Sequence, residues 1–155
     1  MKKENKKIVV VTSGGFDPIH IGHVRLLKAA KRLGDELVVI LNNDNWLKKK
    51  KGFVFIPQEE RKEIISSIKY VDRVIFSKHG PYSKDMSVCA DLENLKPDIF
   101  AKGGDRVKNN MPVPELATCK KINCKLVFNV GRGGKVQSSS WLIKKLLDNK
   151  KINKN

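Results

Sequence analysis

The feature that most constrains this chain is a glycine-containing turn that joins an apolar run to a helical pattern. The run at 8–11, Ile-Val-Val-Val, is typical of a buried strand, and the apolar spacing over 24–33 predicts a helix. Between them, Gly14 and Gly15 lack side chains that would keep an anion away from the backbone N–H groups. The start of a helix also favours negative charge. The junction therefore predicts a phosphate-binding loop.

Two of the three histidines, His20 and His23, fall on this junction. They are three residues apart, so their rings are expected on one face of the first helical turn, and Gly22 between them leaves room for a ligand. Imidazoles can donate hydrogen bonds to phosphoryl oxygens without acting as nucleophiles, which suits charge stabilisation in phosphoryl or nucleotidyl transfer. The alternative is that both histidines only cap the helix.

Apolar runs and helical patterns alternate along the rest of the chain. Strands are expected at 8–11, 37–41, 74–76, 99–101 and 126–130, and helices at 24–33, 58–68, 83–95, 113–122 and 139–147. This alternation predicts an α/β fold of the Rossmann-like kind, a doubly wound parallel five-stranded sheet. In such a sheet ligands bind where the strand order reverses, so the histidine turn is expected there.

A length of 155 residues with 40% hydrophobic composition suffices for one core, so we expect a single domain. Its expected bounds are 8–147, with basic tails at 1–7 and 148–155. No apolar run approaches the length of a membrane span, and the run after the lysine-rich start is too short for a signal peptide. We therefore expect a cytoplasmic protein without a membrane partner. The three cysteines form no Cys-x-x-Cys pair and are expected to be reduced, with no metal site.

The net charge of +16 raises the question of nucleic-acid binding. Most of the excess lies in three short segments, 1–7, 48–51 and 144–155, and solvated lysine tails need no partner. Aromatic residues are not interleaved with the basic ones, as base stacking would require. We expect no nucleic-acid partner, and a nucleic-acid-binding module is kept as the alternative from another functional class.

The residues from Gly14 to His23 read Gly-x-Phe-Asp-x-x-His-x-Gly-His, and this motif resembles the signature of the nucleotidylyltransferase superfamily, specifically its cytidylyltransferase-like members. The resemblance extends over almost the whole chain between the tails. It implies an enzyme that transfers a nucleoside monophosphate from a nucleoside triphosphate to a phosphorylated small molecule and releases pyrophosphate. It further implies Mg²⁺ carried by the triphosphate and a homodimer. In this motif the catalytic residues would be His20 and His23, the nucleotide would contact Gly14, Gly15 and Phe16, and the acceptor would contact Asp17.

The segment 42–52, Asn-Asn-Asp-Asn-Trp-Leu-Lys-Lys-Lys-Lys-Gly, follows the second expected strand and is interpreted as a basic loop. Four lysines alone are equally typical of a solvated loop. The family carries Asn-x-Asp followed by Lys-x-x-Lys-Gly here, so the resemblance implies that Lys48 and Lys51 clamp phosphates during catalysis. Trp46 is a candidate for stacking on a ligand. The resemblance also implies that Asp44 and Arg61 lie at the acceptor, since Arg61 matches an arginine of the family's next helix.

Two more segments, after the fourth and fifth expected strands, combine glycine with polar residues. A plain turn and simple helix capping are the alternatives for them. The resemblance implies nucleotide contacts from Lys102, Gly103, Gly104 and Asp105 in the first, and from Arg132, Ser138, Ser139 and Ser140 in the second.

The Lys-Gly-Gly-Asp sequence at 102–105 bears on the choice of substrates. It resembles the heptose 1-phosphate adenylyltransferases more than the glycerol 3-phosphate cytidylyltransferases, which tend to show Gly-Asp-Asp. We therefore expect ATP as the nucleotide and a sugar 1-phosphate such as heptose 1-phosphate as the acceptor, as in nucleotide-sugar biosynthesis. The alternative is a CTP-dependent enzyme that acts on glycerol 3-phosphate or a related polyol or alcohol phosphate.

Overall fold

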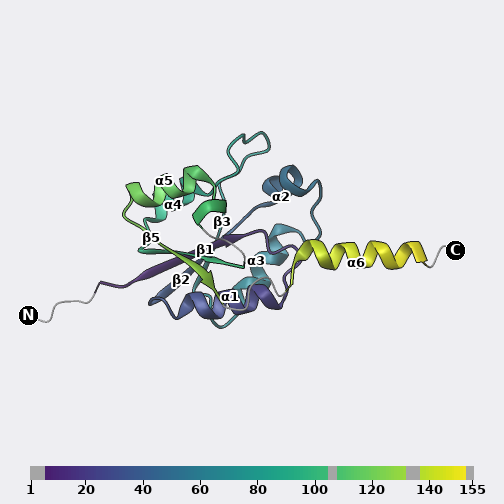
Figure 1. Ribbon diagram of the computed structural model, residues 1–155, viewed down its shortest axis with the longest axis horizontal. Coiled ribbons are helices and arrows are strands. Elements are labelled where there is room, and N and C mark those ends of the chain that lie inside the picture. The colour runs from purple at the N-terminus through teal and green to yellow at the C-terminus, as the bar shows by residue number, and fades with distance from the viewer. Residues whose placement is uncertain (1–5, 105–107, 132–136, 153–155) are drawn as a thin grey trace, which may run out of the picture.

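The computed structural model describes residues 6–104, 108–131 and 137–152 (Figure 1). Within these ranges a single five-stranded parallel sheet has the order β3-β2-β1-β4-β5. Its strands are β1 (Val9–Gly14), β2 (Glu36–Leu41), β3 (Arg73–Phe76), β4 (Ile99–Gly103) and β5 (Lys125–Val130). The expected doubly wound α/β fold in one domain is confirmed.

Helices cover both faces of the sheet. They are α1 (Ile21–Lys31), α2 (Asp44–Lys51), α3 (Gln58–Ser66), α4 (Cys89–Leu95), α5 (Val113–Lys121) and α6 (Ser139–Ile152). In Figure 1, α1 and α3 lie on one side of the strands, and α4 and α5 lie on the other. None of the helices in the described part of the chain is long and apolar enough to cross a membrane.

The strand β2 shows how the sequence divides the core between these faces. Leu37 and Val39 pack with α1 and α3, whereas Val38 and Ile40 pack with α4 and α5. Successive side chains of a strand point to opposite faces, so a continuous apolar run is what a strand covered on both sides requires. The sequence pattern predicts this strand correctly because alternate residues of β2 pack against helices on opposite faces of the sheet.

The strand order reverses beside β1. The chain passes from β1 to β2 and β3 on one side, and β4 then pairs with β1 on the other. The loops that follow β1 and β4 therefore diverge and leave a crevice at the carboxyl edge of the sheet. The turn that carries His20 and His23 begins at the end of β1 and lies at this crevice, as expected from the sequence.

The expectation of a basic loop after β2 is wrong, because residues 44–51 form α2. The side chain of Asn43 caps this helix by accepting the backbone N–H of Trp46 at 3.0 Å. Gly52 ends it with φ of 83°, and the N–H of Gly52 donates to the carbonyl of Lys48 at 2.9 Å. Asp44 in the first turn and the lysines in the last suit the helix dipole. The capping residues and the charges at its two ends, rather than an apolar stripe, specify this helix.

Two other boundaries differ from the sequence expectation. Residues 83–88 form a loop, and α4 begins only at Cys89. The helix α6 runs to Ile152, into the range 148–155 that was expected as a tail, and it projects away from the sheet in Figure 1.

The turn between α1 and β2 contains a tightly packed glycine. A Cβ atom on Gly34 would lie 2.7 Å from Val10 Cγ2 and 2.8 Å from both Ile8 Cγ2 and the Ile8 carbonyl oxygen. We expect Gly34→Ala to lower the free energy of unfolding by about 1–3 kcal/mol, because the backbone of Ile8 cannot move without disturbing β1. The matched control is Gly80→Ala, whose Cβ would meet nothing closer than Ser83 Oγ at 3.7 Å. Urea denaturation of both variants checks this, and equal stabilities would contradict it.

Candidate active site

A cleft of about 710 Å³ opens at the crevice beside β1. This volume lies in the range that small-molecule sites occupy. The site residues predicted from the sequence that line the cleft are Gly14, Gly15, Phe16, His20, His23, Lys51, Lys102, Gly103, Gly104, Ser138, Ser139 and Ser140. The fold thus brings together four segments that are far apart in the chain. Asp105 and Arg132 lie outside the described residues.

The two histidines hold each other and the start of α1 in place. His20 Nδ1 accepts the backbone N–H of Gly22 at 3.1 Å, and His23 Nδ1 accepts the N–H of His20 at 3.2 Å. The two rings stack with centroids 3.8 Å apart. Because each Nδ1 accepts a backbone N–H, each neutral ring carries its proton on Nε2. Capping and ligand binding are therefore compatible, since the cap leaves Nε2–H as the donor of each ring.

Both histidines are neutral at pH 7. Burial, reinforced by the charges of His20 and Lys51, lowers the pKa of His23 from 6.5 to about 3. Burial and the nearby Lys51 ammonium also lower the pKa of His20. Neutral imidazoles that donate from Nε2 are suited to stabilise negative charge by hydrogen bonding, and they are not suited to act as general acids at this pH.

The lysines of α2 differ in whether they line the cleft. Leu47 is fully buried, and Lys51, one turn later on the same face, is half-buried and lines the cleft. Burial lowers the pKa of Lys51, the carboxylate of Asp17 opposes this, and the Arg61 charge adds to it. Lys50 also lines the cleft, although the family motif does not predict it. Lys48 is exposed and is not among the lining residues.

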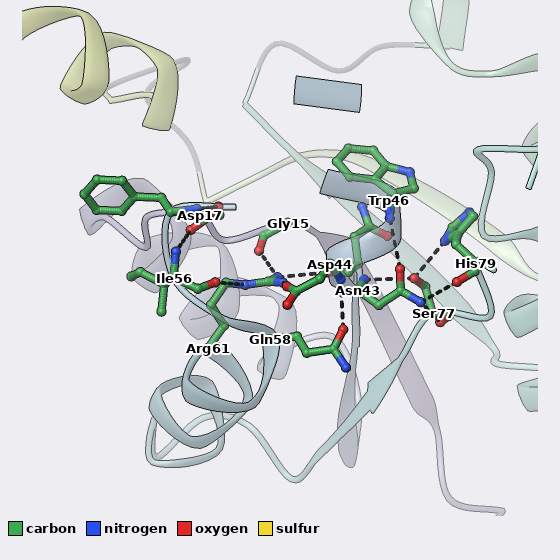
Figure 2. A network of polar contacts seen from close by, with 12 residues as sticks. Gly15, Asp17, Asn43, Asp44, Trp46, Ile56, Gln58, Arg61, Ser77 and His79 are labelled. Carbon is green, nitrogen blue, oxygen red and sulfur yellow. Dashed lines mark hydrogen bonds and ion pairs between the residues drawn. The ribbon is translucent and has the colours of Figure 1, made fainter. Parts of the chain in front are cut away.

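Arg61 lies in a network of polar contacts (Figure 2) that includes the cleft-lining residues Gly15 and Asn42. Its guanidinium is 1% exposed and makes four hydrogen bonds. Nε donates to the carbonyl of Ile56 at 2.8 Å, Nη1 donates to those of Gly15 at 2.7 Å and Asn42 at 2.8 Å, and Nη2 lies 2.6 Å from Asp44 Oδ1. These partners come from three different loops, so Arg61 fixes the floor of the cleft.

Asp17 has a similar role. It is fully buried, and its carboxylate accepts the backbone N–H groups of Phe55 and Ile56, each at 2.7 Å. The sequence predicts acceptor contacts for Asp17, Asp44 and Arg61, but none of them is among the residues that line the cleft. Their geometry supports a positioning role, in which they hold the phosphate loop and α2 together.

The far end of the cleft contains a buried ion pair. Lys102 Nζ lies 3.2 Å from Glu115 Oε2 and 3.5 Å from Ser13 Oγ, and it sits 4.0 Å from the centroid of the Phe100 ring. Glu115 lies on α5 and was not predicted from the sequence, since no motif marks it. The charge of Lys102 is thus compensated by Glu115, and the pair holds the Lys102 side chain against β1 at Ser13.

Asn42, the first residue of the Asn-x-Asp sequence, also lines the cleft, although no site role was predicted for it. Its side chain is 5% exposed, and within the described part of the chain its Oδ1 has no hydrogen-bond partner. A buried acceptor without a partner is costly, so a ligand donor at this point would be stabilising. Its place in the Asn-x-Asp sequence, directly after β2, is the signal that could have identified it.

The serines at the start of α6 join this helix to the histidine turn. Ser139 Oγ donates to the carbonyl of Pro18 at 2.8 Å, and Ser138 Oγ accepts the N–H of Trp141 at 3.4 Å. Ser140 is exposed and lines the cleft. Two helix starts, α1 and α6, therefore meet at the cleft, and their backbone N–H groups favour an anion between them.

Comparison with known proteins gives a consistent family match. A family model described as cytidylyltransferase-like matches residues 11–151. FAD synthase from Pyrococcus horikoshii is 48% identical over 103 residues, which are 66% of each chain. FAD synthase from Thermococcus sibiricus is 35% identical over 147 residues, 94% of this chain and 96% of that protein.

Two further matches are to proteins with other names. The bifunctional protein HldE from Syntrophotalea carbinolica is 37% identical over 108 residues, 68% of this chain but only 21% of that protein. The solved structure of a lipopolysaccharide core biosynthesis protein from Thermoplasma volcanium superposes with a TM-score of 0.66 at 30% identity, and it covers 82% of this chain and 99% of that one.

The lowered pKa of His23 makes a prediction about stability. Between pH 6.5 and about 3, the unfolded chain binds a proton at His23 that the folded chain does not, so stability falls as the pH falls. The slope from this residue approaches about 1.4 kcal/mol per pH unit. We expect the stability advantage of wild type over His23→Asn at pH 7 to shrink, or to reverse, by pH 4. The carboxylates titrate in both proteins and cancel, so parallel stability curves in urea would contradict the prediction.

Proposed function

The chain belongs to the cytidylyltransferase-like family of nucleotidyltransferases, and on that premise we propose that it transfers the adenylyl group of ATP to the phosphate of flavin mononucleotide (FMN). The products are FAD and pyrophosphate. The observation that carries the choice of acceptor is the end-to-end match to an FAD synthase, which spans 94% of this chain and 96% of the relative. The stacked pair of Nε2–H donors at the glycine-containing loop supports the chemistry.

In the proposed reaction a phosphate oxygen of FMN attacks the α-phosphorus of ATP in line. One P–O bond forms, the bond to the pyrophosphate oxygen breaks, and pyrophosphate carries away the electron pair. The acceptor is already an anion, so no residue has to deprotonate it, and catalysis is a matter of positioning and charge stabilisation. His20 and His23 donate from Nε2 to the oxygens that gain charge, while Lys51 and Lys50 neutralise phosphates.

We propose that Mg²⁺ enters with the triphosphate. Among the described residues no group of three or more His, Cys, Asp and Glu side chains is arranged to hold a metal ion. The carboxylates that line the cleft are Asp85 and Glu115, and Glu115 is paired with Lys102, so the lining fits an ion held mainly by triphosphate oxygens. When bound, such an ion would reduce the charge of the triphosphate and of the pyrophosphate that leaves.

A sugar 1-phosphate, the acceptor favoured by the sequence alone, is the second candidate. The matches to HldE and to the lipopolysaccharide core biosynthesis protein favour it. The HldE match covers only a fifth of that protein, whereas the FAD synthase match covers nearly all of both chains. We therefore rank FMN first. The nucleic-acid alternative has only the net positive charge in its favour, and part of that charge lies on α2 beside the cleft.

The acceptor can be identified by a substrate matrix. We expect kcat/KM to be highest for ATP with FMN when pyrophosphate release is measured for ATP or CTP against FMN, heptose 1-phosphate and glycerol 3-phosphate, with the product identified chromatographically. His20→Ala and His23→Ala should each lower turnover by about 10²–10³, which assigns the activity to this site. A higher kcat/KM with a sugar 1-phosphate would make that sugar the acceptor, and the best rate with CTP would exclude ATP.

The two lysines of the family motif should differ in their effect. Lys51→Ala should lower kcat/KM by about 10² or more, because it removes a half-buried charge from the cleft, whereas Lys48→Ala should change it by about twofold at most. Both variants remove one positive charge from the same helix, so the comparison controls for net charge. Equal losses in steady-state assays would mean that Lys48 also reaches the phosphates.

A further inference from the structure

One part of the cleft wall is apolar and has no role in the phosphate chemistry described above. It is formed by Trp46, Met86, Val88, Pro112 and Pro114. Trp46 is half-buried in the first turn of α2, and Val88 is 2% exposed. Apolar and aromatic linings determine which ligand bodies a site accepts, while a few polar groups orient them.

The indole of Trp46 spans the space between the phosphate loop and residues 86–88. Its Nε1 donates to the carbonyl of Met86 at 2.9 Å. At the other end, a Cβ atom on Gly15 would lie 3.7 Å from Trp46 Cζ3, so the ring borders the glycine loop directly. The polar atom of the indole is thus satisfied by the protein, and what the ring offers to a ligand in the cleft is its aromatic surface.

His79 holds the loop that carries Met86 against the start of α2. The carbonyl of Ser87 can only accept, so His79 Nε2 carries a proton and donates to it at 2.9 Å. Ser77 Oγ lies 2.8 Å from His79 Nδ1 and accepts the N–H of Asn43 at 3.1 Å. Asn43 Nδ2 also donates to the carbonyls of Ser77 at 3.0 Å and His79 at 2.7 Å.

These contacts make the apolar wall rigid before any ligand arrives. Figure 2 shows the contacts among Asn43, Ser77 and His79, with the indole of Trp46 pointing away from them. Lys49 Nζ also donates to the carbonyl of Ser83 in the same loop. A pre-formed surface stacks on a flat ligand without a further cost of ordering its side chain.

We propose that Trp46 stacks on the isoalloxazine ring of the acceptor, with Met86 and Val88 at the edge of the ring, and that this surface selects a flavin over a sugar. The inference rests on the proposed function and names the residues that give it its acceptor. Trp46 and Lys50 are four residues apart on α2 and therefore neighbours on one face, and both line the cleft. An aromatic surface next to a cation matches a ligand that has a flat, largely apolar ring at one end and a phosphate at the other.

The test compares Trp46→Leu and Trp46→Phe with Trp141→Leu, the same substitution at an exposed tryptophan that does not line the cleft. Trp46→Leu should raise the KM for FMN about 10-fold or more and leave the KM for ATP within about twofold. Trp46→Phe keeps an aromatic ring but loses the bond to Met86, and should recover most of the affinity. Trp141→Leu should behave as wild type.

Riboflavin, which has the ring but no phosphate, separates this inference from the proposed reaction. Stacking quenches its fluorescence, so its binding can be measured without turnover. We expect wild type, Trp46→Phe and Trp141→Leu to quench the fluorescence of riboflavin, and we expect Trp46→Leu not to quench it.

Equal quenching by wild type and Trp46→Leu overturns the stacking surface even if FAD is made. Equal loss in Trp46→Phe and Trp46→Leu also overturns it, because the bond to Met86 would then be what matters. If wild type binds riboflavin through Trp46 but forms no FAD, the proposed reaction fails and the ring site stands.

Discussion

The buried guanidinium of Arg61 is the constraint on which the site depends. It joins the carbonyl of Gly15 after β1, the carbonyl of Asn42 and the carboxylate of Asp44 after β2, and the carbonyl of Ile56 before α3. A buried charge is tolerated only when it is fully hydrogen-bonded, so the three loops must keep these positions for the arginine to remain inside. Arg61 thereby fixes the glycine loop after β1 relative to the start of α2.

Most of the fold follows from patterns that one sequence displays. The apolar runs predict all five strands because each strand packs apolar side chains against the core, and the glycines with His20 and His23 mark the turn where the strand order reverses. The pattern of apolar residues does not predict the helix α2. Its residues are mostly lysine and asparagine, and the cap of Asn43 and the left-handed Gly52 hold it rather than an apolar stripe.

The site was less predictable than the fold, because a motif names residues but does not say which of their atoms neighbouring groups occupy. Asp17 and Arg61 belong to the family motif, and their polar atoms bind protein backbone. Lys48 and Lys51 carry the same charge, and the burial of Leu47, one turn before Lys51, places Lys51 rather than Lys48 at the cleft. Glu115 reaches the cleft through long-range packing, for which a single sequence carries no signal.

The capping of His20 and His23 has a consequence for how the enzyme responds to acidity. Each Nδ1 is committed to a backbone N–H, and burial lowers the pKa of both rings, that of His23 to about 3, so His23 does not change its charge near neutrality. The second ionisation of a phosphate monoester, by contrast, falls at about pH 6. In the proposed reaction the attacking group is such a phosphate. In that reaction the pH at which activity begins would follow the ionisation of the acceptor rather than that of His23, and exchanging one phosphorylated acceptor for another would move the onset.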